Sequence, residues 1–203
     1  HPIVEKNLKP KGLKFTPITI ELGQGVSCST GANMGGKTVS LKLVGLLSAM
    51  AQYGLMVPAD EMKLGLNKFI KTSIGDLQAI DKGLSTFGGE IKRISEAVEI
   101  SSKKGLILID ELARGTNPEE GYAISKALVE YLKNQKSITL ITTHYDNIGN
   151  TEGVSHLQVV GLSNVDFCQL ETEIAGNTQD KMDIINKYMD YRLKIMDNGK
   201  AET

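Results

Sequence analysis

The feature that most constrains this chain is a phosphate-loop pattern, Gly, four residues and then Gly-Lys-Thr, which reads GANMGGKT at residues 31–38. Residues 26–30 before it predict a short buried strand, and residues 39–52 after it predict a helix with apolar residues on nearly every side. Glycines let backbone N–H groups close around phosphate oxygens, and the positive end of the following helix favours an anion. A chance match in a glycine-rich turn is the alternative. The pattern therefore predicts a nucleotide site in which Lys37 reaches the β- and γ-phosphates and Thr38 offers its hydroxyl to Mg²⁺.

Two acidic residues, Asp110 and Glu111, directly follow the apolar run at residues 106–109. An uninterrupted apolar run this short predicts a strand buried on both faces of a parallel sheet. The carboxyl ends of such strands are where open α/β sheets bind ligands. A helix-capping acid pair is the alternative. With a nucleotide, Asp110 would hold Mg²⁺, usually through water, and Glu111 would polarise the attacking water.

A single histidine, His144, follows the next predicted strand at residues 137–142. A histidine in such a position is more often a structural hydrogen-bonding group than a catalytic one. Because this strand should end at the same edge of the sheet as Asp110 and Glu111, we expect His144 to sense the γ-phosphate.

The size and composition of the chain fit one α/β domain. Its 203 residues, 40% of them hydrophobic, suffice for one sizeable core. A net charge of −1 and a pI of about 6.4 indicate no basic nucleic-acid surface on this segment. Cys28 and Cys168 lack metal-ligand spacing and, as reduced thiols, fit a cytoplasmic location. We expect no secretory leader and no membrane span, and the start at His1 suggests a piece of a longer protein.

The remaining segments predict the elements that would surround the site. We expect strands at residues 15–22, 68–74, 156–161, 167–171 and 189–195, with 156–161 and 167–171 as a candidate hairpin. A helix should begin at Ser85, whose hydroxyl could be no more than an N-cap, and bury a stripe of Ile91, Ile94, Val98 and Ile100. Another should begin after the capping residue Asn117, with Pro118 in its first turn, and bury Ile124, Leu128 and Leu132.

Taken together, these motifs resemble the ATPase domain of MutS proteins. Five of them stand in the family's order within residues 1–150: HPIVE at 1–5, the phosphate loop, STF at 85–87, DELARGT at 110–116 and TTHY at 142–145. Five motifs in order are far more specific than any one of them. An adenylate-kinase or GTPase interpretation of the loop explains none of the other four.

The resemblance implies a P-loop NTPase with an ABC-like α/β fold, in which helices flank a mostly parallel central sheet. It implies ATP and Mg²⁺ as cofactors and a homodimer, or a heterodimer with a related ATPase, that sandwiches each nucleotide between two domains. Phe15 would stack on adenine, and Ser85 would complete the partner's site. The expected phosphate contacts are Asn33, Met34, Gly35, Gly36, Lys37, Thr38 and Val39. We expect residues 1–203 to form one domain, with 151–203 as a C-terminal extension.

The sequence leaves three classes of function open. Three segments resemble the MutS-like branch that acts outside mismatch repair more closely than they resemble the mismatch-repair members: residues 36–42, 74–80 and 84–87. Residues 151–203 lack the Ser-Tyr-Gly segment of mismatch-repair members and look similar to MutS-like proteins associated with cobalamin-dependent aminomutases.

The first hypothesis is an ATPase that drives clamp action on DNA, in mismatch repair or a related transaction, with DNA held by regions outside this chain. The second is ATP-driven reactivation of a protein partner such as an aminomutase. The third is a nucleotide-dependent assembly module with little hydrolysis, against which the set Asp110, Glu111 and His144 argues. We rank DNA first.

Overall fold

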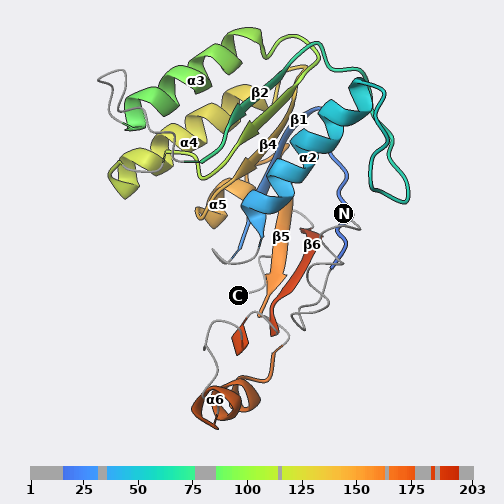
Figure 1. The fold of residues 1–203 in the computed structure, drawn as a ribbon. Helices are drawn as coiled ribbons and strands as arrows, with labels where there is room; N and C mark the ends of the chain where they lie inside the picture. The colour runs from blue at the N-terminus through green and yellow to red at the C-terminus, as the bar shows by residue number, and fades with distance from the viewer. Residues whose placement is uncertain are drawn as a thin grey trace.

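The computed structural model describes residues 16–31, 36–75, 86–113, 116–162, 165–176, 184–185 and 188–196. Its strands form one six-stranded sheet in the order β2-β3-β4-β1-β5-β6 (Figure 1). The strands are β1 (Gly25–Thr30), β2 (Ile70–Ser73), β3 (Leu106–Ile109), β4 (Ile138–Thr142), β5 (Ser155–Gly161) and β6 (Asp190–Met196). Neighbouring strands run parallel from β2 to β5, and β6 runs antiparallel to β5. The mostly parallel sheet that we predicted is confirmed.

Helices cover both faces of this sheet (Figure 1). The helix α2 (Lys37–Gln52) packs on one face through Leu41, together with the leucines of the strands. The opposite face carries α3 (Thr86–Ile100), α4 (Pro118–Leu132) and α5 (Asp146–Gly149). None of the helices in the described part of the chain is long and apolar enough to cross a membrane.

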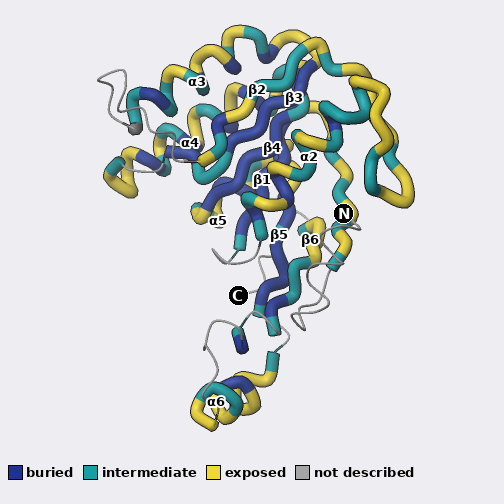
Figure 2. Tube along the Cα trace, in the orientation of Figure 1, coloured by how far each residue is buried: buried dark blue, intermediate teal, exposed yellow. Residues whose placement is uncertain are grey.

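The strand β3 is buried on both faces, as its apolar run predicted (Figure 2). Its leucines, Leu106 and Leu108, face α2, while its isoleucines, Ile107 and Ile109, face α3 and α4. All four are at most 3% exposed. The strands β1 and β4 are also buried for most of their length. The residues that directly follow β1, β3 and β4 are therefore held on a well-packed sheet.

The start of α4 is as predicted, but its buried stripe is only partly so. The side chain of Asn117 accepts a hydrogen bond of 2.9 Å from the N–H of Glu119, and Pro118 occupies the first turn. Leu132 is buried, but the rest of the buried face consists of Gly121, Ser125 and Val129. Ile124 and Leu128 are half buried beside it. Small residues let α4 approach closely: a Cβ at Gly121 would lie 2.6 Å from the hydroxyl of Tyr145.

The strand predicted at residues 15–22 is wrong for its described part. Residues 16–23 have no regular secondary structure, although Ile20 and Leu22 pack against the leucine cluster under α2. Alternating burial therefore arises here without pairing to a neighbouring strand. Pro17, which has no N–H to donate, fits this irregular course.

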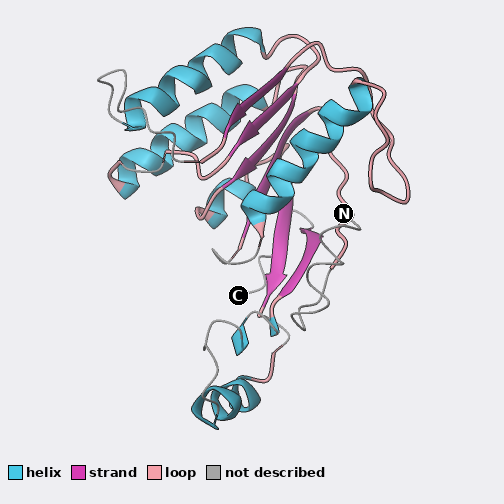
Figure 3. Ribbon diagram, in the orientation of Figure 1, coloured by secondary structure: helices cyan, strands magenta, loops and turns pink. Residues whose placement is uncertain are grey.

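The predicted hairpin of residues 156–161 with 167–171 is also wrong. Residues 167–171 belong to the helix α6 (Phe167–Gly176), and the antiparallel partner of β5 is β6 (Figure 3). The reason is local: the Asp166 carboxylate accepts hydrogen bonds from the N–H groups of Cys168 and Gln169, which caps a helix start. The strands predicted at 68–74, 156–161 and 189–195 are confirmed as β2, β5 and β6.

Candidate nucleotide site

The carboxyl ends of β1, β3 and β4 meet at one edge of the sheet, because β4 lies between the other two strands. The segment after β1 leads into α2 with Lys37 and Thr38, and β3 ends at Asp110. The hydroxyl of Thr38 donates a hydrogen bond of 3.0 Å to Oδ1 of Asp110, although the two residues are 72 positions apart. The structure thus brings together the two residues that the sequence predicted as Mg²⁺ ligands.

Lys37 is the first residue of α2 and is only 4% exposed. Its ammonium group donates a hydrogen bond to the carbonyl oxygen of Gly31. Burial lowers the pKa of Lys37, and the charges of Glu111, Asp110 and Asp146 oppose that shift. A cation held in so little water interacts strongly with an anion placed beside it.

Thr142, the last residue of β4, connects the two acids of the site. Its hydroxyl donates a hydrogen bond of 2.7 Å to Oδ1 of Asp110 and accepts one of 2.9 Å from the N–H of Glu111. The residue is fully buried, so water does not compete for these bonds. Sequence reasoning gave Thr142 no role; a polar residue at the end of an apolar strand was the signal that could have found it.

The turn that carries Glu111 holds two non-glycine residues in the left-handed region. Glu111 has φ 49° and Ala113 has φ 61°. Each such residue costs about 1–2 kcal/mol, so surrounding contacts must hold the turn. One contact is the bond from the N–H of Glu111 to Thr142, and another is a bond of 3.1 Å from the N–H of Ala113 to the Glu90 carboxylate on α3.

His144 lies at the same edge of the sheet, exposed, two residues beyond β4. Its ring lies 4.3 Å from the ring of Tyr145, and Tyr145 in turn meets Tyr122 of α4 edge-on at 5.8 Å. The N–H of Tyr145 donates a hydrogen bond to the hydroxyl of Thr143. The hydrogen bond between Tyr145 and Thr143 therefore spans the residue between them, His144.

The start of α2 also borders the C-terminal strand. Gly36 has φ 79°, a conformation that favours glycine, and a Cβ there would lie 3.3 Å from the ring of Tyr191 on β6. Sequence reasoning did not connect Tyr191 with the site, because nothing in the local pattern reports this long-range approach. Val39 is 69% exposed on the outer side of α2. The predicted contacts Phe15, Asn33, Met34, Gly35 and Ser85 lie outside the described residues.

The residues at this edge fit Mg²⁺. A hydroxyl and a carboxylate oxygen 3.0 Å apart are hard oxygen donors of the kind that Mg²⁺ prefers. In the described part of the chain, no group of three or more His, Cys, Asp and Glu side chains could hold a metal ion. One or two protein ligands suffice for Mg²⁺, since it keeps several waters and binds substrate phosphates.

A parallel sheet with a buried lysine after one strand and an acidic pair after another defines a phosphate-loop α/β domain. The chain belongs to the MutS family: residues 27–189 match the family model of MutS domain V, a P-loop ATPase domain. This match confirms the family resemblance of the motifs.

The chain is also similar to bacterial proteins named endonuclease MutS2. It is 40% identical over 161 residues to the protein of Fusobacterium nucleatum subsp. nucleatum. It is 42% identical over 151 residues to that of Caldicellulosiruptor saccharolyticus and 40% identical over 151 residues to that of Acetivibrio thermocellus. These alignments cover 73–76% of the chain and 18–20% of the relatives, so the chain spans about a fifth of their length. They lend no support to the aminomutase-associated type.

Proposed function

We propose that this chain is a Mg²⁺-dependent ATP-binding and ATP-hydrolysing domain. The observation that carries the proposal is the hydrogen-bonded set of Thr38, Asp110, Thr142 and Glu111 beside the buried ammonium of Lys37. This set offers a cation for phosphates, oxygen ligands for a metal and a carboxylate for water, which are the parts that phosphoryl transfer to water requires.

In this proposal, each residue has one role. Lys37 binds the β- and γ-phosphates, and Thr38 and Asp110 hold Mg²⁺, which neutralises phosphate charge when bound. Glu111 accepts the proton of the attacking water, and His144 contacts the γ-phosphate. The other contacts implied by the family motifs complete the site: Phe15 on adenine, and Asn33, Met34, Gly35, Gly36 and Val39 along the loop.

We further propose that an ABC-like dimer couples the ATP state to clamp action on DNA. The relatives named endonuclease MutS2 support a DNA-related role. Since this chain has a net charge of −1, DNA would be held by regions outside it. Ser85 of each subunit would complete the site of the other. No specific observation favours remodelling of a protein partner or an assembly module with little hydrolysis.

Nucleotide binding is tested with Lys37→Ala. A ligand that binds only the folded chain stabilises it by about 2.7 kcal/mol at a hundredfold excess over Kd. We expect ATP with Mg²⁺ to raise the Tm of the parent and to leave that of Lys37→Ala unchanged. Lys42→Ala is the matched control, because Lys42 is exposed on the same helix. An undiminished ATP shift in Lys37→Ala would contradict the proposed site.

A further inference from the structure

Helix α3 contacts the turn that carries Glu111 through Glu90. Oε1 of Glu90 accepts the hydrogen bond from the N–H of Ala113, which lies 23 residues further along the chain. At equal geometry, a carboxylate accepts a stronger hydrogen bond from a backbone N–H than a neutral oxygen does. The early part of α3 and the acidic turn are therefore joined directly, not only through the sheet between them.

This bond acts where the backbone most needs support. Ala113 has φ 61° and lies two residues from Glu111, which has φ 49°. An L-residue does not keep such a conformation unaided. Leu112 and Ala113 are 1% and 3% exposed, so packing holds their side chains. Glu90 holds the backbone of the turn through the N–H of Ala113.

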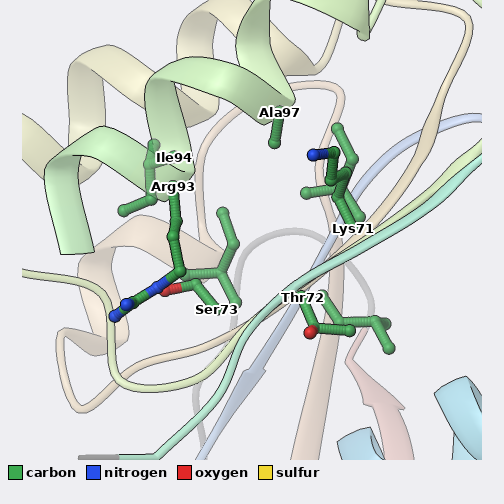
Figure 4. Close-up of a pocket in the computed structure, with 9 residues that line it drawn as sticks. Lys71, Thr72, Ser73, Arg93, Ile94 and Ala97 are labelled. Atoms are coloured by element: carbon green, nitrogen blue, oxygen red, sulfur yellow. The ribbon is translucent and has the colours of Figure 1, made fainter. Parts of the chain in front are cut away.

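Helix α3 does not need Glu90 in order to dock on the sheet. Ile94 and Ala97 are 6% and 4% exposed and pack into the core against Ile107 and Ile109. Figure 4 shows Arg93, Ile94 and Ala97 of α3 beside Lys71, Thr72 and Ser73 of β2. The apolar contacts of the middle of the helix hold it in place, and the bond of Glu90 is an additional tie to the turn.

We infer that Glu90 is a positioning residue for Glu111: it holds the left-handed turn that presents the Glu111 carboxylate, and it makes that turn follow the position of α3. The inference rests on the proposed function. In the proposed dimer, α3 begins beside the residue that reaches the partner's nucleotide, Ser85. Docking of α3 on one nucleotide therefore sets the geometry of water activation at the other.

The experiment compares three substitutions at Glu90. Glu90→Ala removes the acceptor, Glu90→Asp keeps the charge but is one methylene shorter, and Glu90→Gln keeps both the length and an acceptor oxygen. We expect Glu90→Ala and Glu90→Asp to lower kcat about tenfold to a hundredfold, because misplacing a catalytic group by about 1 Å costs up to that factor. Glu90→Gln should stay within about threefold of the parent, as expected for a bond that needs only an acceptor.

The affinity for ATP separates this role from a general loss of structure. It is measured for each variant from the Tm shift with ATP and Mg²⁺, and it should stay close to the parental value. Glu99→Ala, an exposed glutamate of the same helix, is the matched control and should behave as the parent.

The outcomes distinguish the inference from the function on which it rests. A parent that binds ATP and turns it over, together with a Glu90→Ala variant of parental kcat, overturns the inference alone. So does a Glu90→Gln variant that is as slow as Glu90→Ala. If Glu90→Ala does not fold, the comparison of Glu90→Asp with Glu90→Gln decides. A parental kcat in Glu90→Asp together with a lowered kcat in Glu90→Gln would also overturn the inference. A parent that binds no ATP overturns both.

Discussion

At the scale of single residues, the site depends on one hydroxyl that serves two acids. Thr142 donates to Asp110 and accepts from the N–H of Glu111, so the position of each acid depends on the same buried atom. Glu111 is thereby held close to Asp110 and to the Mg²⁺ site that Asp110 would form. The two neighbouring acids can then have different tasks, because their surroundings differ.

Glu111→Gln tests the separation of binding from chemistry. The amide keeps the shape and hydrogen-bonding capacity of the side chain but cannot accept the proton of water. We expect the variant to retain ATP affinity and to lose about 10²–10⁴-fold in turnover. Single-turnover hydrolysis, with Glu119→Gln of α4 as an exposed control, measures this. A parental rate would show that Glu111 is not the base.

At the scale of helices and strands, a buried side-chain contact connects the neighbouring strands β1 and β5. His156 of β5 is 2% exposed, and its Nε2 lies 2.7 Å from the hydroxyl of Thr30 at the end of β1. The ring also packs against Gly149 of α5, where a Cβ would lie 2.6 Å from it. The strand leading into the phosphate loop is thus tied to β5 by a titratable group.

This histidine makes stability depend on pH. Burial lowers the pKa of His156 below its ordinary 6.5, and the charge of Asp146 opposes that shift only in part. The unfolded chain therefore binds a proton more readily than the folded chain. The free energy of unfolding should be greatest above pH 6.5 and fall as the pH is lowered towards the pKa of the folded state.

Urea denaturation at a series of pH values measures this dependence. Glutamine has no titratable group, so the free energy of unfolding of His156→Gln should lack this part of the pH dependence, whether the variant is more or less stable than the parent. Equal slopes in the parent and His156→Gln would contradict the prediction.

The elements that sequence reasoning predicted correctly are those with a strong local pattern. The run at β3, the cap at Asn117 and the alternation at β6 each specify their conformation within a few residues. The predicted strand at 167–171 is wrong because the capping side chain of Asp166 outweighs a short apolar pattern. In the site, the sequence predicted that Thr38 and Asp110 lie together, because both residues follow strands whose carboxyl ends meet at one edge of the sheet. The contacts of Glu90 and Tyr191 did not, because they join segments far apart in the chain.

At the scale of the whole molecule, the proposed dimer divides each site between two chains. Mixing Lys37→Ala with Ser85→Ala tests this division. If the parts come from different subunits, a heterodimer has one site with both defects and one with neither. We expect each variant alone to be inactive and the mixture to recover part of the ATPase activity, measured where heterodimers are confirmed. No recovery would contradict a shared site whose two halves work independently.

The antiparallel strand β6 has a consequence for the place of β1 within the sheet. It covers the outer side of β5, and β5 covers the outer side of β1, which carries the phosphate loop. A chain that stopped at residue 150 would turn β1 into an edge strand, with a row of unpaired N–H and C=O groups that invites pairing with other chains. The strands β5 and β6, which carry none of the nucleotide motifs, therefore keep β1 inside the sheet, and the edge falls on β6 instead.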